Sequence, residues 1–165
     1  MNQRVLVIDS DLRRSGIQTE LGLNVQGGLS TYLQERCTVQ PHRLNFWGNY
    51  VDILPAGESP YDPITLLSSP LFETLMTKSK ELYDIVLVDT PPVLGMADAL
   101  KVGAVCDGTV LVARLDQITQ QELTEVLSLL TPINVLGIVA NGGRDGSARY
   151  VNYSNRVHAS AQTDC

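Results

Sequence analysis

Four short runs of aliphatic residues place the strongest limit on the fold of this chain. They span residues 5–8, 85–88, 109–113 and 135–140. A weaker run at 51–54 ends at a proline. Apolar and polar residues do not alternate in these runs, as they do in strands with one solvated face. Continuous apolar strands are typical of a parallel sheet that helices cover on both faces.

Helical patterns lie between the apolar runs. Thr119 and Glu122 form a capping-box pattern that predicts a helix over 118–130, with apolar residues at helical spacing. Ser69 followed by proline predicts the start of a second helix over 70–82. Shorter helices are expected near 16–22, 29–35 and 97–103. The repeated order of strand and helix predicts a three-layer α/β domain.

Composition excludes several classes of protein. The chain has 165 residues, of which 44% are hydrophobic and 18% charged, as in an ordinary globular domain. A net charge of −6 argues against a nucleic-acid partner, because phosphate neutralisation needs clustered basic residues. The three cysteines are widely spaced and odd in number, so no disulfide framework follows and a reducing cytoplasmic location is expected. They form no CxxC pair, and the two histidines have no metal-ligand spacing. No apolar run reaches the length of a membrane span.

Aspartates follow two of the apolar runs. Asp9 and Asp11 come after the first run, and Asp89 ends the second. In open α/β sheets, ligands bind in the crevice at the carboxyl ends of the strands, where carboxylates suit Mg²⁺. The alternative is that these aspartates only cap the turns or helices that follow.

Several motifs resemble the cytoplasmic kinase domain of the bacterial tyrosine kinases (BY-kinases) of capsular and exopolysaccharide synthesis, which are related to ParA/MinD-type P-loop ATPases. Residues 5–14, an apolar run followed by D-x-D-L-R-R, are similar to the family's second Walker-type motif. Residues 84–92 are similar to its Walker B strand. Further similarity lies at 54–57, 62–63, 66–70, 97–100 and 139–141. The D-x-D-L-R-R form favours tyrosine kinases over partition ATPases.

The resemblance implies a P-loop NTPase-like sheet, ATP and Mg²⁺ as cofactors, and a set of site residues. Asp9 and Asp11 would hold the metal and orient or deprotonate the attacking tyrosine, and Asp89 would support the metal through water. Arg13 would face phosphate or a neighbouring subunit, with a plain surface charge as the alternative. Asn141 would border the adenine, with a strand-end turn as the alternative.

The resemblance also divides the chain. Residues 1–145 are expected to form a partial P-loop kinase-like domain, and 146–165 a flexible tail. Tyr150 and Tyr153 in this tail would be autophosphorylation sites.

One departure from the family is large. No G-x-x-x-x-G-K-[ST] phosphate-binding loop occurs in the sequence. In the family this loop and its strand lie upstream of the position of Met1. A truncated gene start, a decayed gene and a subunit completed by another chain all remain open. The absence of a central strand predicts exposed sheet edges at 5–8 and 85–88.

Three functions therefore stay open. The first is a protein-tyrosine kinase domain that regulates capsule and exopolysaccharide synthesis and export, inactive as this chain alone. The second is a dead remnant or regulatory binding module, and the third is a ParA/MinD-type positioning ATPase. The kinase reading implies a membrane polysaccharide co-polymerase or activator, protein tyrosine substrates and a homo-oligomer as partners. It also implies a place at the inner face of the plasma membrane, through a partner or an upstream segment.

Overall fold

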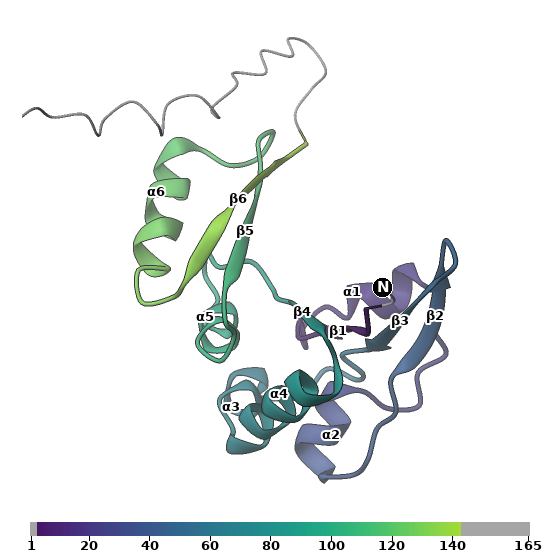
Figure 1. Ribbon diagram of the computed structural model, residues 1–165. Coiled ribbons are helices and arrows are strands. Elements are labelled where there is room, and N and C mark those ends of the chain that lie inside the picture. Colours follow the sequence, from purple (N-terminus) through teal and green to yellow (C-terminus); the bar gives the residue numbers. More distant parts are fainter. Residues whose placement is uncertain (1–2, 143–165) are drawn as a thin grey trace, which may run out of the picture.

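The computed structural model describes residues 3–142 (Figure 1). Its elements in chain order are β1 (Val5–Asp9), α1 (Gly16–Glu20), α2 (Leu29–Glu35), β2 (His42–Phe46), β3 (Asn49–Leu54), α3 (Pro63–Leu67), α4 (Pro70–Leu82), β4 (Ile85–Asp89), α5 (Asp98–Gly103), β5 (Thr109–Arg114), α6 (Gln120–Leu129) and β6 (Val135–Asn141). All five apolar runs form strands, and all five predicted helices are present. The described helices are each too short or too polar to cross a membrane.

The strands form two separate sheets. The first has the order β2-β3-β1-β4, and the second contains only β5 and β6. Parallel pairing joins β1 to β3, β1 to β4 and β5 to β6. The prediction of an exposed edge at 5–8 is wrong, because β1 is hydrogen-bonded on both sides. The prediction for 85–88 is confirmed, since β4 ends the first sheet.

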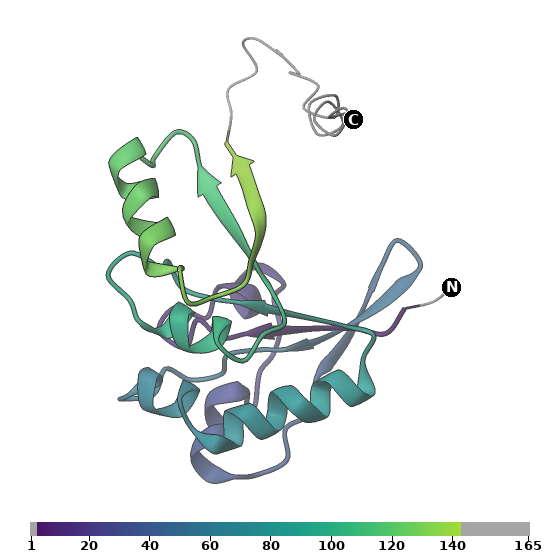
Figure 2. The same cartoon turned by 60° about the vertical axis from the view of Figure 1, so that its left-hand side comes forward.

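Helices flank both sheets. The three helices α2, α3 and α4 lie together on one face of the four-stranded sheet, and α6 lies along β5 and β6 (Figure 2). The core between the four-stranded sheet and its helices contains Leu6 and Ile8 from β1, Leu54 from β3, and Phe72 and Met76 from α4. The mixed α/β class with a mainly parallel sheet is thus confirmed.

Local sequence signals explain where the two longest helices begin. The Ser69 hydroxyl accepts a hydrogen bond from the Phe72 N–H at 3.3 Å, as expected for the cap of α4. At α6 the Thr119 hydroxyl accepts from the Glu122 N–H at 3.2 Å, and the Glu122 carboxylate accepts from the Thr119 N–H at 2.8 Å. The predicted capping box is therefore formed in both directions.

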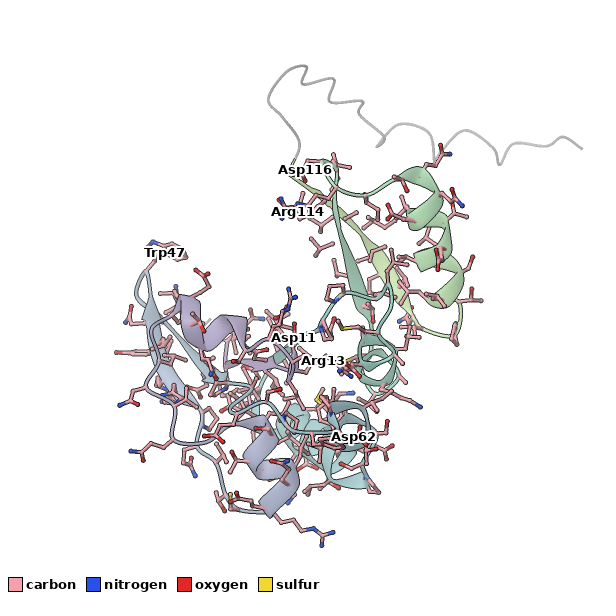
Figure 3. All side chains as sticks on the ribbon, turned by 180° about the vertical axis from the view of Figure 1, so that it is seen from behind. Asp11, Arg13, Trp47, Asp62, Arg114 and Asp116 are labelled. Carbon is pink, nitrogen blue, oxygen red and sulfur yellow. The ribbon has the colours of Figure 1, made fainter. Side chains whose placement is uncertain are left out.

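The β2–β3 hairpin was not predicted. Strand β2 runs antiparallel to β3, so the sheet is not purely parallel. Trp47 (φ 49°) and Gly48 (φ 84°) form its two-residue turn, and the exposed Trp47 indole lies at the tip (Figure 3). At its base, Asp52 accepts from Arg43 at 2.7 and 2.9 Å and from the Tyr83 hydroxyl at 2.9 Å. A tryptophan in a left-handed turn is rare, which conceals the hairpin in the sequence.

A close backbone approach fixes the loop after β3. The N–H groups of Leu29 and Ser30, at the start of α2, donate to the carbonyls of Pro55 and Ala56 at 2.8 and 2.9 Å. Gly28 lies between these segments. A Cβ atom on Gly28 would meet the Pro55 carbonyl oxygen and lie 2.5 Å from the Gly57 nitrogen. Because both neighbours are backbone atoms, glycine is required by space at this position.

We predict that Gly28→Ala destabilises the chain by about 1–3 kcal/mol, the usual cost of overpacking. The measurement is urea denaturation followed by circular dichroism. Gly27→Ala is the matched control, since its Cβ would meet only the Thr31 side chain at 3.6–3.7 Å. Equal stability of the two variants would contradict the role assigned to the close approach.

Candidate functional site

Two carboxylates meet at the carboxyl ends of neighbouring strands. Asp9 ends β1 and Asp89 ends β4, and the two residues are direct partners in the parallel register. The Ser10 N–H, at 2.9 Å, and the Ser10 hydroxyl both donate to the Asp89 carbonyl, which locks the two strand ends together. The strand-end position predicted for both aspartates is thus the observed one.

Asp9 is fully buried and organises the loop that follows it. Its two carboxylate oxygens accept the N–H groups of Asp11 at 3.1 Å and Ile17 at 3.3 Å. Asp11 in turn accepts the N–H groups of Arg13 and Arg14 at 3.2 and 3.0 Å. Both aspartates therefore cap turns, as the alternative interpretation expected. A carboxylate that caps a turn still has free lone pairs, with which it can accept further hydrogen bonds or hold a metal.

Three aspartates, Asp9, Asp11 and Asp89, lie at this edge without a basic partner among the described residues. Burial raises the pKa of Asp9 to about 6, its two N–H bonds oppose the rise, and the charges of Asp89 and Asp11 add to it. Burial also raises the pKa of Asp89 above its ordinary value, and the Asp11 charge adds to that rise. Among residues 3–142, none of the five ion pairs involves these three aspartates. The edge is therefore suited to a cation.

The donor set fits a shared magnesium site rather than a closed one. No group of three or more His, Cys, Asp or Glu side chains within the described part of the chain is arranged to hold a metal by itself. Mg²⁺ is usually bound by one or two carboxylates together with phosphate oxygens and water. Asp11 and Asp89 are both accessible to solvent at this edge, so they are the residues that would contact such an ion, with Asp9 behind them.

Arg13 contacts a partner that the sequence did not suggest. Its guanidinium donates to the Asp98 carboxylate at 2.6 Å through Nε and at 3.4 Å through Nη2. Asp98 is 1% exposed and begins α5, whereas the Arg13 side chain is 43% exposed. Figure 3 shows Arg13 and Asp11 between the four-stranded sheet and α5. The ion pair thus ties the acidic loop to α5, and a nucleotide contact by Arg13 stays a prediction.

A groove separates β4 from β5. It has a volume of about 1060 Å³, and residues of both strands line it along their length. Asp89 lies at its carboxyl end together with Asn141 and Arg114, which are partners in the β5–β6 register. Asn141 and Asp89 therefore border the same groove. Arg114 was missed by the sequence analysis, although its place directly after an apolar run is a signal of the same kind.

Two predicted site residues cannot be placed. Tyr150 and Tyr153, with the proposed tail at 146–165, lie outside the described residues. Their role as autophosphorylation sites stays a prediction.

We predict that Arg13→Ala destabilises the chain more than Arg14→Ala does, because it leaves the buried Asp98 carboxylate without its counter-charge. The loss is smaller than for a fully buried pair, since the Arg13 end is partly hydrated. Thermal and urea denaturation measure the change. Arg14→Ala is the matched control from the neighbouring position, and an equal loss in both variants would exclude a special role for the Arg13–Asp98 pair.

We also predict a pH effect of Asp9. A carboxyl whose folded pKa is raised binds its proton more tightly in the native state, so the stability it contributes is present below pH 4 and lost as pH rises through 6. The stability of Asp9→Asn relative to the parent chain should therefore increase by about 2–3 kcal/mol from pH 4 to pH 7. Any fixed cost of the new amide is the same at both pH values and cancels from this difference.

The measurement is urea denaturation at both pH values. Asp107→Asn serves as a control, since the Asp107 side chain is 86% exposed. A stability difference between Asp9→Asn and the parent that does not change with pH would contradict the raised pKa.

Comparison with known proteins shows what this chain is similar to. No family model matches the chain. The tyrosine-protein kinase YwqD of Bacillus subtilis is 32% identical over 142 residues, which cover 85% of this chain and 60% of that protein. The solved kinase domain of the Escherichia coli tyrosine kinase ETK matches with a TM-score of 0.80 and 32% identity, over 90% of this chain and 59% of the solved one.

A more distant likeness shows the fold alone. The septum site-determining protein MinD of Pyrococcus horikoshii, solved with Mg-ADP, matches with a TM-score of 0.65 at 23% identity. The chain thus spans 60% of its YwqD relative and 59% of the ETK chain. Its homologues are bacterial tyrosine kinases, and its fold is similar to that of their kinase domains and to the P-loop NTPase fold of MinD.

Proposed function

We propose that this chain forms the carboxylate side of a protein-tyrosine kinase site that transfers the γ-phosphoryl group of ATP. The observation that carries the proposal is the in-register pair of Asp9 and Asp89 at the carboxyl ends of β1 and β4, in a chain whose homologues are tyrosine kinases. The acids, without a basic partner among the described residues, would be neutralised by Mg²⁺.

Each carboxylate has a distinct part in this proposal. Asp11 would hold Mg²⁺ and Asp89 would support it through water, while buried Asp9 orders the loop that carries Asp11 by accepting the N–H groups of Asp11 and Ile17. Asp9 or Asp11 accepts the proton of the attacking tyrosine hydroxyl. Mg²⁺ held by these carboxylates would supply charge neutralisation for the transferred phosphoryl group, which is the main requirement of this chemistry. Arg13 and Asn141 are the proposed contacts to phosphate and base.

The phosphate-binding side of the site is absent from these 165 residues, because no G-x-x-x-x-G-K-[ST] motif occurs in them. ATP has no backbone cradle here, and the acids alone repel its phosphates. We therefore expect this chain by itself to transfer no phosphate.

The biological setting of the proposal follows the resemblance to the kinases of capsular and exopolysaccharide synthesis. The partners would be a membrane polysaccharide co-polymerase or activator, protein tyrosine substrates, and further copies in a homo-oligomer. The site would then work on the cytoplasmic side of the plasma membrane. Domain 1–145 would carry the site and tail 146–165 the target tyrosines.

The missing motif also favours a second candidate function. A regulatory binding module could retain the fold and the acidic edge without turning over ATP. Restoring the phosphate loop separates the two functions, because a module that has lost catalysis by other changes stays inactive.

The test is a chimera in which the strand and phosphate loop of the YwqD relative are fused ahead of Met1. With ATP–Mg²⁺ we expect phosphate on Tyr150 and Tyr153, detected by mass spectrometry, and none with the unfused chain. Changing Asp9 and Asp11 together to Asn should lower the labelling rate by about 10²-fold or more, since metal binding and proton transfer are both lost.

Asp107→Asn, a change to an exposed carboxylate away from this edge, is the control and should leave the rate unchanged. Labelling of the chimera that survives the double substitution would refute the assignment of Asp9 and Asp11. A folded chimera that never labels tyrosine would favour the binding module.

A further inference from the structure

The tip of the β2–β3 hairpin carries an aromatic side chain at a position that the backbone disfavours. Trp47 and Gly48 both have positive φ angles, of 49° and 84°. Such turn positions favour glycine and asparagine, and a bulky side chain that adopts them is strained. Trp47 is 96% exposed, so burial within the described chain does not offset the strain. A strained residue outside the core indicates a role beyond the fold.

The residues around Trp47 order the tip and leave it uncharged. The Gly48 N–H donates to the Asn45 side-chain oxygen at 2.9 Å, which closes the turn. Tyr50, which pairs with Asn45 in the hairpin register, is 59% exposed beside it. No residue at 44–51 has a charged side chain. The tip therefore presents two aromatic rings to solvent from an ordered turn, and covering it buries no charge.

The tip lies at the edge of the four-stranded sheet opposite the acidic site. Strands β1 and β3 run parallel, and Val5 at the start of β1 pairs with Val51. Trp47 precedes Val51 by four residues, so the hairpin extends beyond the amino end of β1 by roughly 10 Å. Figure 3 shows Trp47 at this tip, away from Asp11. The acids of the candidate site thus face away from whatever the tip contacts.

The aspartates nearer the tip are neutralised by arginines. Asp52 of β3 is paired with Arg43, and Asp84, directly before β4, is paired with Arg4. The three aspartates without a basic partner in residues 3–142 lie at the opposite edge. A phase of low polarity can therefore approach the tip without dehydrating an unpaired carboxylate, which is the costly step.

We propose that the tip is a membrane contact: Trp47 and Tyr50 enter the headgroup region of a phospholipid bilayer and orient the chain with its acidic edge away from the lipid. Side chains with an apolar ring and one polar group are typical of that region. A protein partner fits less well, because two aromatic side chains bury about 150–250 Å² each, whereas a stable interface needs about 800 Å² from each partner. A lipid surface needs no shaped complement.

The contact orients the chain rather than anchoring it. Two aromatic side chains bury less apolar surface than a single lipid chain, which itself binds membranes only marginally and reversibly. Another contact must keep the chain near the bilayer, and the membrane partner of the proposed function supplies it. Only this setting rests on the proposed function, because the hairpin geometry stands by itself.

The test uses the full 165-residue chain, tethered by a C-terminal histidine tag to phosphatidylcholine vesicles that contain a nickel-chelating lipid. Trp47 is the single tryptophan of the sequence, so its fluorescence reports on the tip alone. We expect its emission to shift to shorter wavelength and to be quenched by brominated phosphatidylcholine. Both effects should persist in about 0.5 M salt, which screens contacts between charges. No shift and no quenching would overturn the proposal.

A moved reporter is the matched control. Tyr61 is fully exposed in the loop that follows the carboxyl end of β3. In the double variant Tyr61→Trp with Trp47→Tyr, the tip stays aromatic and the only indole lies in that loop. Its emission should be neither shifted nor quenched. Equal quenching at the two positions would show that the tether alone brings the chain to the lipid, which overturns an orienting contact.

A charge placed on the tip tests the contact with Trp47 still present. Asn45→Asp keeps the oxygen that accepts from the Gly48 N–H and adds only a charge. The quenching of Trp47 should be largely lost, since a carboxylate is costly to bury. Gln117→Glu adds the same charge at an exposed position after β5 and should leave the quenching unchanged. Equal effects of the two changes would contradict the proposal.

Stability separates this role from a role in folding. Trp47→Gly should not lower the urea midpoint, because glycine adopts a positive φ without strain. A clear loss of stability would show that Trp47 serves the fold through its ring contact with Phe46, and would overturn the proposal. An emission shift that grows with chain concentration without vesicles would identify a second copy as the occupant, which also overturns it. No measurement includes nucleotide, so kinase failure and lipid-contact failure are distinguished.

Discussion

The parallel pairing of β1 with β3 on one side and β4 on the other is the interaction on which the rest of the structure depends. It buries Leu6 and Ile8 against the helices of one face. The same register brings Asp9 beside Asp89, so packing of the core and placement of the acids have one cause. A slip of this register would separate the carboxylates and turn apolar side chains to the wrong face.

The acidic edge is held by the backbone around it rather than by opposite charges. Asp9 accepts two N–H groups of its own loop, and Asp11 accepts two more. Such bonds order the carboxylates without neutralising them, while burial raises the pKa of Asp9 against their effect. A site of this kind is ordered but electrostatically incomplete, which suits a cation that arrives together with a polyanionic substrate.

The groove between β4 and β5 exposes apolar side chains and backbone groups that have no partner among the described residues. Exposed valines and leucine on β4 and β5, which are edge strands of their sheets, leave apolar surface and backbone groups in contact with water. The electrostatic and the structural gaps meet at the carboxyl end of the groove, where Asp89, Arg114 and Asn141 lie.

The sequence by itself determined the five strands, the five helices predicted, and the strand-end position of the aspartates. These features depend on apolar periodicity and on caps between residues three positions apart, such as Thr119 and Glu122. It did not reveal β2 or α3, because the alternating polar residues of β2 and the short α3 carry little local signal.

Only the tertiary structure decided which strands lie at the edges and what Arg13 contacts. The Arg13–Asp98 pair joins residues 85 positions apart, and the gap between β4 and β5 depends on how whole sheets are placed. Local propensity contains no information about such contacts. They follow from the packing that satisfies the largest number of apolar surfaces and backbone groups at once.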